Sequence, residues 1–232
     1  ARVLAGGALA AEAPSQRLSA LADRFVGEMV AYDPTIAYFN GLPTDDHGRF
    51  ADRTPQALAA RGALEAADLK ALQAIDPSGL PTASRATYAV LKEKLASDLQ
   101  LRVCRKELWG VSHLDGLQVV FLQVAQQQPV GTAQARAQAL ARWGSAPHAI
   151  DVEIANLERG LKEGYAAPRS VTRRVIGQLD AVLGAPVDKS PLYSPAGRDT
   201  DPAFRAAFAR LLTEQVNPAI RRYRDYLAND YL

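Results

Sequence analysis

Alanine occupies 43 of the 232 positions of this chain. Alanine has the highest intrinsic helix propensity, so its abundance biases most of the chain toward helix. Aromatic residues make up only 7% of the sequence, and no segment sustains the apolar and polar alternation of a half-buried strand. The composition therefore favours an all-α fold and argues against a β-sandwich or a β-barrel.

Apolar residues recur at steps of three and four along most of the chain, as on one face of an amphipathic helix. In the first predicted helix, which starts at Ser15, this stripe consists of Leu18, Leu21, Phe25 and Met29. Another start is predicted at Thr54-Pro55, where a hydroxyl N-cap precedes a proline at the first helical position. The whole pattern predicts an irregular bundle of about seven helices in a helical domain over residues 15–232.

The last predicted helix begins at Asp201-Pro202, after the longest loop, which covers residues 184–200. The proline of Asn217-Pro218 should kink this helix. Its apolar stripe is wider than one core face needs, and an uncovered stripe of this kind drives self-association. We therefore expect the isolated chain to associate with itself through a surface made of Phe204, Phe208, Leu211, Leu212, Val216, Ile220, Tyr223, Tyr226 and Leu227.

Charge and cysteine content exclude several classes. The chain has 27 Lys and Arg against 25 Asp and Glu, a balance that argues against a dedicated nucleic-acid binder. No apolar stretch reaches the roughly 18 to 20 residues that span a bilayer. Cys104 is the only cysteine, so a disulfide within the chain and a cysteine-rich zinc site are both excluded. We expect Cys104 to be a small buried residue.

The two ends of the sequence suggest a longer protein. Residues 1–14 form a short run of small apolar residues that contains Ala8-Leu9-Ala10, an Ala-x-Ala pattern. This run is either the remnant of a secretory signal peptide, which implies a periplasmic or secreted bacterial protein, or a flexible tail. The only methionine is Met29, and the last helical pattern reaches Leu232 with no cap after it. We expect an N-terminal piece of a longer chain.

Residues 104–131 break the helical rhythm. Irregular backbone beside an aromatic side chain is where binding pockets form. The candidate substrate-cleft residues in this segment are Trp109, Ser112, His113 and Asp115. For His113 the sequence favours a structural role over this functional one.

The other polar clusters carry no catalytic assignment. Asp45-Asp46-His47 fits a solvated loop better than a metal site, and His148 fits the surface at a helix start. The basic runs Arg173-Arg174 and Arg221-Arg222-Arg224 fit solvated helix faces or ion pairs with Asp180 and Asp225. The alternative for these runs is a patch that binds phosphate or carboxylate. No two of the three histidines and the single cysteine occur at helical spacing, so we assign no catalytic and no metal-binding residue to this chain.

Several short segments carry a family resemblance through their order and spacing. They are Asp33-Pro34-Thr35-Ile36-Ala37 with Gly41, Arg53-Thr54-Pro55-Gln56-Ala57-Leu58, Trp109-Gly110 with Leu114-Asp115-Gly116-Leu117, Glu158-Arg159-Gly160-Leu161-Lys162-Glu163-Gly164, Pro168-Arg169-Ser170-Val171, Gln178-Leu179-Asp180, Ser190-Pro191-Leu192-Tyr193 and Tyr223-Arg224-Asp225-Tyr226-Leu227. On these segments the chain resembles, from about Leu18 to Leu232, the bacterial family catalogued as domain of unknown function 885. Its members look like zinc metallopeptidases of the all-helical, thimet-oligopeptidase-like clan.

The resemblance implies the cleft-forming, N-terminal part of a larger helical metallopeptidase-like fold that acts on peptides. The family's zinc signature, His-Glu-x-x-Pro-Gly-His, should lie beyond residue 232, because His47, His113 and His148 do not form it. The zinc cofactor would then belong to the C-terminal catalytic half of the full-length protein, and this chain alone should be inactive. The alternative is a non-enzymatic helical module that binds a partner protein in the bacterial periplasm.

Overall fold

A computed structural model describes residues 13–232 of the chain. Helices make up 76% of these residues, and none of them forms a strand, so the prediction of an all-α, irregular helical fold is confirmed. Helix α1 begins at Pro14. Apart from Ala13 and Pro14, the segment interpreted as a signal-peptide remnant or tail, residues 1–14, lies outside the described residues.

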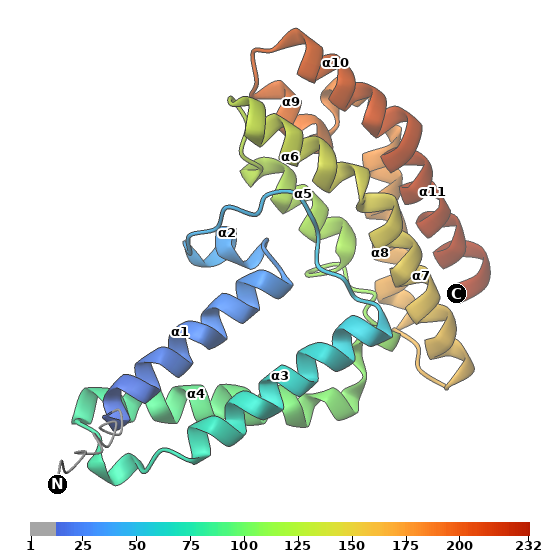
Figure 1. Ribbon diagram of the computed structural model, residues 1–232. Coiled ribbons are helices and arrows are strands. Elements are labelled where there is room, and N and C mark those ends of the chain that lie inside the picture. The colour runs from blue at the N-terminus through green and yellow to red at the C-terminus, as the bar shows by residue number, and fades with distance from the viewer. Residues whose placement is uncertain (1–12) are drawn as a thin grey trace, which may run out of the picture. The chain divides into compact units, whose positions relative to one another are not determined.

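The α-helices follow one another mostly with short connections, but a long loop over residues 41–54 joins α2 to α3 (Figure 1). They are α1 (Pro14–Tyr32), α2 (Ile36–Asn40), α3 (Pro55–Gln73), α4 (Thr82–Leu101), α5 (Leu117–Gln127), α6 (Ala133–Gly144), α7 (Ala146–Lys162), α8 (Arg169–Gly184), α9 (Ser194–Gly197), α10 (Pro202–Leu211) and α11 (Asn217–Tyr226). Short 3₁₀ helices are η1 (Pro77–Gly79), η2 (Arg102–Cys104), η3 (Lys106–Leu108), η4 (Val187–Lys189) and η5 (Pro191–Tyr193), and π-helical turns are η6 (Leu212–Val216) and η7 (Leu227–Tyr231).

Local signals place several helix starts. The Thr54 hydroxyl accepts a hydrogen bond from the Ala57 backbone N–H at the start of α3, as its N-cap position predicts. The Asp201 carboxylate caps α10 in the same way, accepting from two backbone N–H groups of the first turn. The predicted loop over residues 184–200 is wrong in part, because η4, η5 and α9 lie within it.

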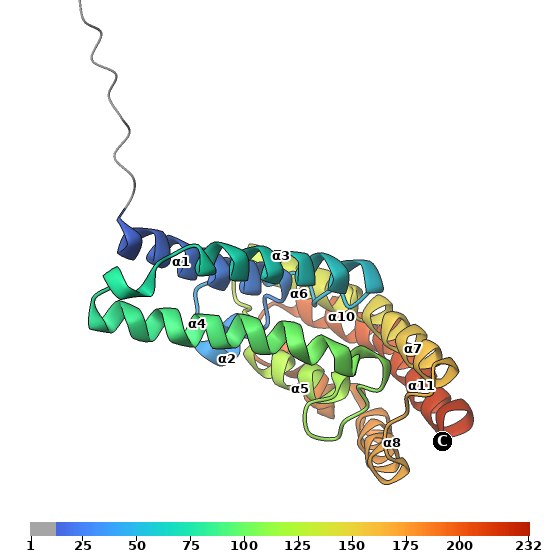
Figure 2. The same ribbon diagram turned by 90° about the horizontal axis from the view of Figure 1, so that it is seen from below.

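The chain divides into two compact units, and the dividing points fall inside α1, α3 and η2. Unit 1 comprises, of the described residues, 13–28 and 60–103, and unit 2 comprises 29–59 and 104–232. Side chains from α1, α3 and α4 form most of the core of unit 1, and Figure 2 shows the ribbons of these three helices. Its buried apolar residues are Leu18, Leu21, Phe25, Leu72, Ile75, Leu80, Tyr88, Leu91 and Leu95.

Charged side chains share the inner face of α3 with these apolar residues. Arg61, Glu65 and Asp68 are all buried. The Glu65 carboxylate accepts hydrogen bonds from the Arg61 Nε, at 2.8 Å, and from the Arg102 Nε, at 3.1 Å. Asp68 Oδ1 accepts from Arg24 Nη2 at 2.5 Å. Unit 1 therefore contains paired internal charges, which burial tolerates only when each one has a partner.

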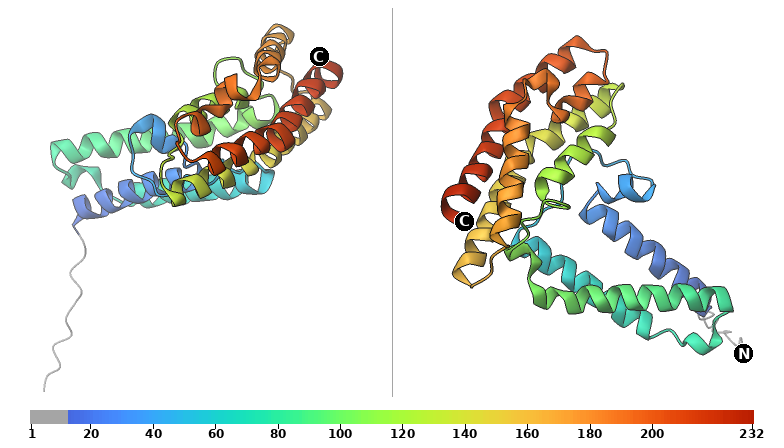
Figure 3. Two further views of the ribbon diagram at one scale, coloured as in Figure 1. Left: turned by 90° about the horizontal axis from the view of Figure 1, so that it is seen from above. Right: turned by 180° about the vertical axis from the view of Figure 1, so that it is seen from behind.

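Unit 2 has a larger core, in which four aromatic rings meet. The Phe50 ring centroid lies 4.7 Å from that of Phe121 and 5.6 Å from that of Trp143, and Trp143 lies 6.1 Å from Phe208. Helix α11 packs on α7 and on α8 (Figure 3). These contacts hold the C-terminal helices against the middle of the chain.

The expected exposed stripe on the final helix is wrong. Phe208, Leu212 and Val216 are each 0% exposed, because α6, α7 and α8 of the same unit cover this face. The predicted kink takes the form of a π-helical turn, η6, which ends directly before Asn217-Pro218. Cys104, expected to be buried, is exposed at the end of η2.

Candidate functional site

The four predicted cleft residues lie in unit 2, in the segment that leads from η3 into α5. The Trp109 indole N–H donates to the Cys104 carbonyl oxygen at 2.8 Å. The Ser112 hydroxyl accepts from the backbone N–H groups of Leu114, at 3.2 Å, and Asp115, at 3.3 Å. These three hydrogen bonds are local, and they fix the irregular backbone of this segment.

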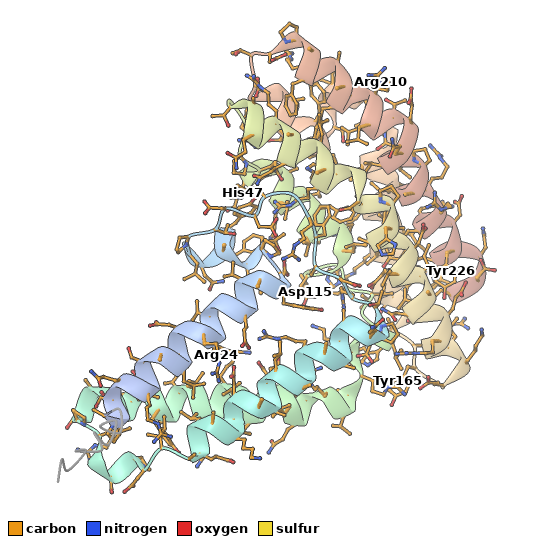
Figure 4. All side chains as sticks on the ribbon, in the orientation of Figure 1. Arg24, His47, Asp115, Tyr165, Arg210 and Tyr226 are labelled. Atoms are coloured by element: carbon orange, nitrogen blue, oxygen red, sulfur yellow. The ribbon has the colours of Figure 1, made fainter. Side chains whose placement is uncertain are left out.

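His113 and Asp115 point to different partners. His113 Nε2 lies 3.3 Å from Arg174 Nη1 on α8, whereas Asp115, labelled in Figure 4, faces Lys106 Nζ at 3.2 Å. Hydrogen bonds from Ser112 and then Lys106 lower the pKa of Asp115. Ser112 and Asp115 are therefore hydrogen-bonded to each other, whereas Trp109 and His113 have other partners. None of the four residues lines either cavity described below. Their role in substrate binding stays a prediction.

A cavity of about 240 Å³ lies elsewhere in unit 2, beside the first turns of α7. The loop between α2 and α3 forms one side of it, and α5 and α7 form the other. Its apolar lining comes from Phe50, Ala51, Leu117, Val120, Ala149 and Val152, and its polar lining from Asp33, Thr35, Arg49, Asp52, Arg53, Ser145 and His148. A partly apolar cavity with a few converging polar groups is the usual form of a small-ligand site.

Arg53 links this cavity to a buried acid. The Arg53 side chain is 37% exposed, and its Nη1 lies 3.5 Å from Oε2 of Glu153, whose side chain is 2% exposed. Neither carboxylate oxygen of Glu153 has a hydrogen-bond partner among the described residues. Burial raises the pKa of Glu153, and the nearby Arg53 opposes that rise. Arg53 and Glu153 therefore form an ion pair with no hydrogen bond between them.

The other polar groups of the cavity have local partners or face solvent. Arg49 Nε pairs with Asp46 at 2.7 Å, and one of its Nη groups donates to the Tyr32 carbonyl oxygen at 3.3 Å. Asp33 Oδ1 accepts from the backbone N–H and the hydroxyl of Thr35. His148 is exposed, as predicted. Among these groups, the Arg53 guanidinium stands out because it makes no hydrogen bond to another described residue.

A second, shallower cavity of about 280 Å³ borders the loop that contains Asp45 and His47. His47 Nδ1 is hydrogen-bonded to the Tyr38 hydroxyl at 2.9 Å. Burial, and next the charge of Arg142, lower the pKa of His47. Arg142 is itself fully buried, and it donates to the Tyr38 hydroxyl at 2.6 Å and to the Arg49 carbonyl oxygen at 2.9 Å. This network anchors the loop to α6.

The zinc that the family resemblance implies does not fit the residues of this structure. Within residues 13–232, no group of three or more His, Cys, Asp or Glu side chains could hold a metal ion. His47 is committed to Tyr38 and His113 to Arg174. We therefore derive no catalytic step through a metal from these residues.

Sequence reasoning missed Arg53 and Glu153 as candidate site residues. Arg53 begins one of the segments that carry the family resemblance, and Asp33 begins another. The structure brings these two segments to one cavity. Their place at the start of these segments was the signal that the sequence offered for Arg53 and Asp33. Glu153 had none, since a glutamate on a helix ordinarily faces solvent.

Comparison with known proteins places the chain in a family. Residues 34–232 match the family model described as "Bacterial protein of unknown function (DUF885)". The chain belongs to this family. No curated protein matches the sequence of this DUF885 chain.

A solved structure shares the fold of the DUF885 chain. It is described as "the putative lipoprotein from Colwellia psychrerythraea", and the match has a TM-score of 0.74 at 12% sequence identity. The match covers 94% of this chain and 41% of the other, so the DUF885 chain spans less than half of that protein's length. At this identity the similarity shows a common fold alone. Within residues 13–232, no helix combines the length and the apolar character needed to cross a bilayer.

Proposed function

We propose that this chain is the N-terminal, substrate-binding region of a secreted, metallopeptidase-like DUF885 protein that acts on peptides. The observation that carries the proposal is the cavity beside α7, where guanidinium, carboxylate and apolar groups line one small space. A peptide presents the same three kinds of group, in its chain ends, its amides and its side chains. The match to a protein of which this chain covers 41% supports a region of a larger whole.

In this proposal the chain binds and orients the peptide, and the hydrolytic groups belong to a C-terminal catalytic half. Zinc, when bound there, would activate the water that attacks the peptide bond. The described residues supply no ligand set for it, so their part is to hold the substrate. Remote binding energy of this kind lowers the barrier when it positions the scissile bond against the catalytic group.

The test compares this chain with a protein extended by the residues that its gene encodes after Leu232. A mixture of fluorogenic peptides is the substrate. We expect hydrolysis by the extended protein, its loss on chelation, and none by residues 1–232 alone. Ala149→Leu, which fills the cavity, should raise KM of the extended protein, whereas Gly177→Ala on α8 should not. An extended protein that cleaves none of the peptides would contradict the proposal.

One observation favours the alternative, a non-enzymatic helical module that binds a partner protein. Val90, Leu101 and Val103 in unit 1 are 71%, 62% and 79% exposed, and exposed apolar side chains can mark an interaction surface. Self-association of the chain would also use such a surface. Sedimentation of the wild-type chain and of a Val90→Ser/Leu101→Ser/Val103→Ser variant tests whether this surface mediates self-association. A concentration-dependent dimer of the wild type should be lost in the variant.

We also propose a periplasmic or secreted location. The Ala8-Leu9-Ala10 pattern supports it, as does the description of the structurally similar protein as a lipoprotein. Fractionation of cells that express the full gene product tests this proposal, since it requires the protein outside the cytoplasmic fraction.

A further inference from the structure

We propose that the cavity beside the first turns of α7 is a carboxylate-binding site, in which the Arg53 guanidinium binds the carboxylate of a small ligand. The proposal rests on the proposed function only for the natural source of that carboxylate, which we take to be the C-terminus of a peptide. It assigns a specific chemistry to one residue, Arg53, and a specific class of ligand to one cavity.

The first support is the state of the Arg53 guanidinium. A guanidinium carries five N–H donors in a planar fork, which matches a carboxylate in a bidentate geometry. Arg53 donates no hydrogen bond to a described residue, and Glu153 lies 3.5 Å away. Its backbone, in contrast, is fixed, because Asn156 Nδ2 on α7 donates to the Arg53 carbonyl oxygen at 2.9 Å. The site thus has a positioned cation with unused donors, and the cation borders an open space.

The second support is the acid behind Arg53. Glu153 is buried and has no hydrogen-bond partner on either oxygen among the described residues. Burial raises the pKa of Glu153. Because neither Glu153 oxygen forms a hydrogen bond, the N–H donors of Arg53 stay available to an anion from solution. The backbone of Gly110 lies close by, since a Cβ added there would be 3.7 Å from Arg53 Nη2.

The third support is a second polar side chain at the cavity. Ser145, His148 and Ala149 line it, and α7 begins at Ala146. The backbone of this first turn has few free donors, because Pro147 has no N–H and the Ala149 N–H donates to the Ser145 carbonyl oxygen. The imidazole of His148 is a potential donor from the same turn. Arg53 and His148 therefore border one cavity.

The remaining charges around the cavity limit the ligand. Asp33 and Asp52 also line it, so a polyanion such as a phosphate chain would be repelled. Each is held by its own loop, Asp33 by Thr35 and Asp52 by the Thr54 backbone N–H. The volume of about 240 Å³ corresponds to roughly eight water molecules at about 30 Å³ each. A single carboxylate on a small, partly apolar body fits these limits.

The experiment titrates the whole chain with two probes that differ only in the charge of one end. The first is N-acetyl-alanyl-alanine, with a free carboxylate, and the second is its C-terminal amide. Binding is followed by chemical-shift changes in two-dimensional NMR spectra of the ¹⁵N-labelled protein. We expect the acid to shift resonances of residues 49–53 and 145–152, and to bind roughly tenfold or more tightly than the amide.

Two variants and one control make the test specific. Arg53→Gln should weaken binding of the acid to the level of the amide. Ala149→Leu changes no charge but fills the cavity, so it should also abolish binding, and it serves if Arg53→Gln fails to fold. Arg222→Gln removes an exposed guanidinium of unit 2 that pairs with Asp151, and it should leave the affinity unchanged.

Equal affinity for acid and amide, no binding of the acid, or full affinity in a folded Arg53→Gln variant would overturn the carboxylate site. The proposed function fails separately. If the extended protein cleaves peptides but shows no preference for a free carboxylate, the peptide function stands and the carboxylate site falls. If the acid binds as expected and the extended protein cleaves nothing, the site stands and the peptidase function falls.

Discussion

The carbonyl oxygen of Leu108 occupies the space that a side chain at position 160 would need. A Cβ added to Gly160 would lie 1.9 Å from that oxygen, a distance that no non-bonded pair can adopt. Gly160 is on α7 and Leu108 ends η3, so the absence of a side chain is what allows these two elements to pack together. The obstacle is a backbone atom, which cannot rotate away as a side chain can.

Replacing Gly160 with alanine should therefore destabilise the protein. Overpacking against backbone costs up to about 3 kcal/mol, whereas the higher helix propensity of alanine returns about 1 kcal/mol. We expect Gly160→Ala to lower the free energy of unfolding by about 2 kcal/mol, measured by urea denaturation. The matched control is Gly177→Ala on α8, where a Cβ would meet no atom within 4 Å. That variant should gain about 0.5 to 1 kcal/mol. Equal stability of Gly160→Ala and wild type would contradict the packing argument.

Arg142 should be among the side chains that unit 2 can least replace. Its guanidinium is fully buried, donates to Tyr38, Gln128 and two backbone carbonyl oxygens, and stacks over the Tyr38 ring at 5.2 Å. Arg142→Met keeps much of the volume but removes every donor, which leaves buried oxygens unsatisfied.

We expect Arg142→Met to reduce the free energy of unfolding by about 3 kcal/mol. Arg222→Met, at an exposed ion pair with Asp151, should change it by no more than about 0.5 kcal/mol. Thermal and urea denaturation of both variants provide the measurement. A variant at position 142 that matches the one at position 222 would show that the network adds nothing to stability.

The helical class was predictable because its causes are local. Alanine content acts within each segment, and the N-caps at Thr54 and Asp201 act within a single turn. The inward charges of α3 were not predictable, because the partners Arg24 and Arg102 come from α1 and η2. A pattern of apolar spacing along one helix cannot reveal a face whose partners lie elsewhere in the sequence.

The same limit explains the final helix and the candidate site. The stripe that includes Phe208 looked too wide for one core face, yet three other helices of unit 2 cover it. The cavity beside α7 is assembled from four separate stretches of sequence, at residues 33–35, 49–53, 117–120 and 145–152. Reasoning from neighbours along the chain instead favoured Trp109, Ser112, His113 and Asp115, which lie close together in sequence but do not line this cavity.

The charge network of unit 1 should control the local stability of that unit. Glu65 has a 6% exposed side chain and accepts from both Arg61 and Arg102. Glu65→Ala removes the shared carboxylate and should destabilise unit 1 by about 2 to 3 kcal/mol, because one guanidinium is itself buried. Hydrogen exchange should speed up at amides of residues 61–101. Glu93→Ala, on the exposed face of α4, should leave exchange unchanged, and a similar effect of both variants would contradict the role of the network.

Glu153 should make the stability of the protein fall as pH rises. Burial raises its pKa in the folded state above the ordinary glutamate value of 4.5, which we take for the unfolded chain. Below that value both states hold the proton, and the stabilising contribution is complete. Above it the unfolded chain releases the proton while the folded chain retains it, so the free energy of unfolding declines by at most about 1.4 kcal/mol per pH unit. The decline ends once the pH passes the folded-state pKa.

Glu153→Gln replaces the carboxyl with a neutral group of the same shape and should remove this dependence. Near pH 4 we expect the variant and the wild type to have similar stability. From about pH 5 upward the variant should become progressively more stable than the wild type, as measured by urea denaturation at each pH. Glu158→Gln removes an exposed carboxylate from the same helix and controls for net charge. A wild type that gains stability relative to Glu153→Gln as pH rises would mean that the ion pair with Arg53 outweighs burial, and that Arg53 is less available to an external carboxylate.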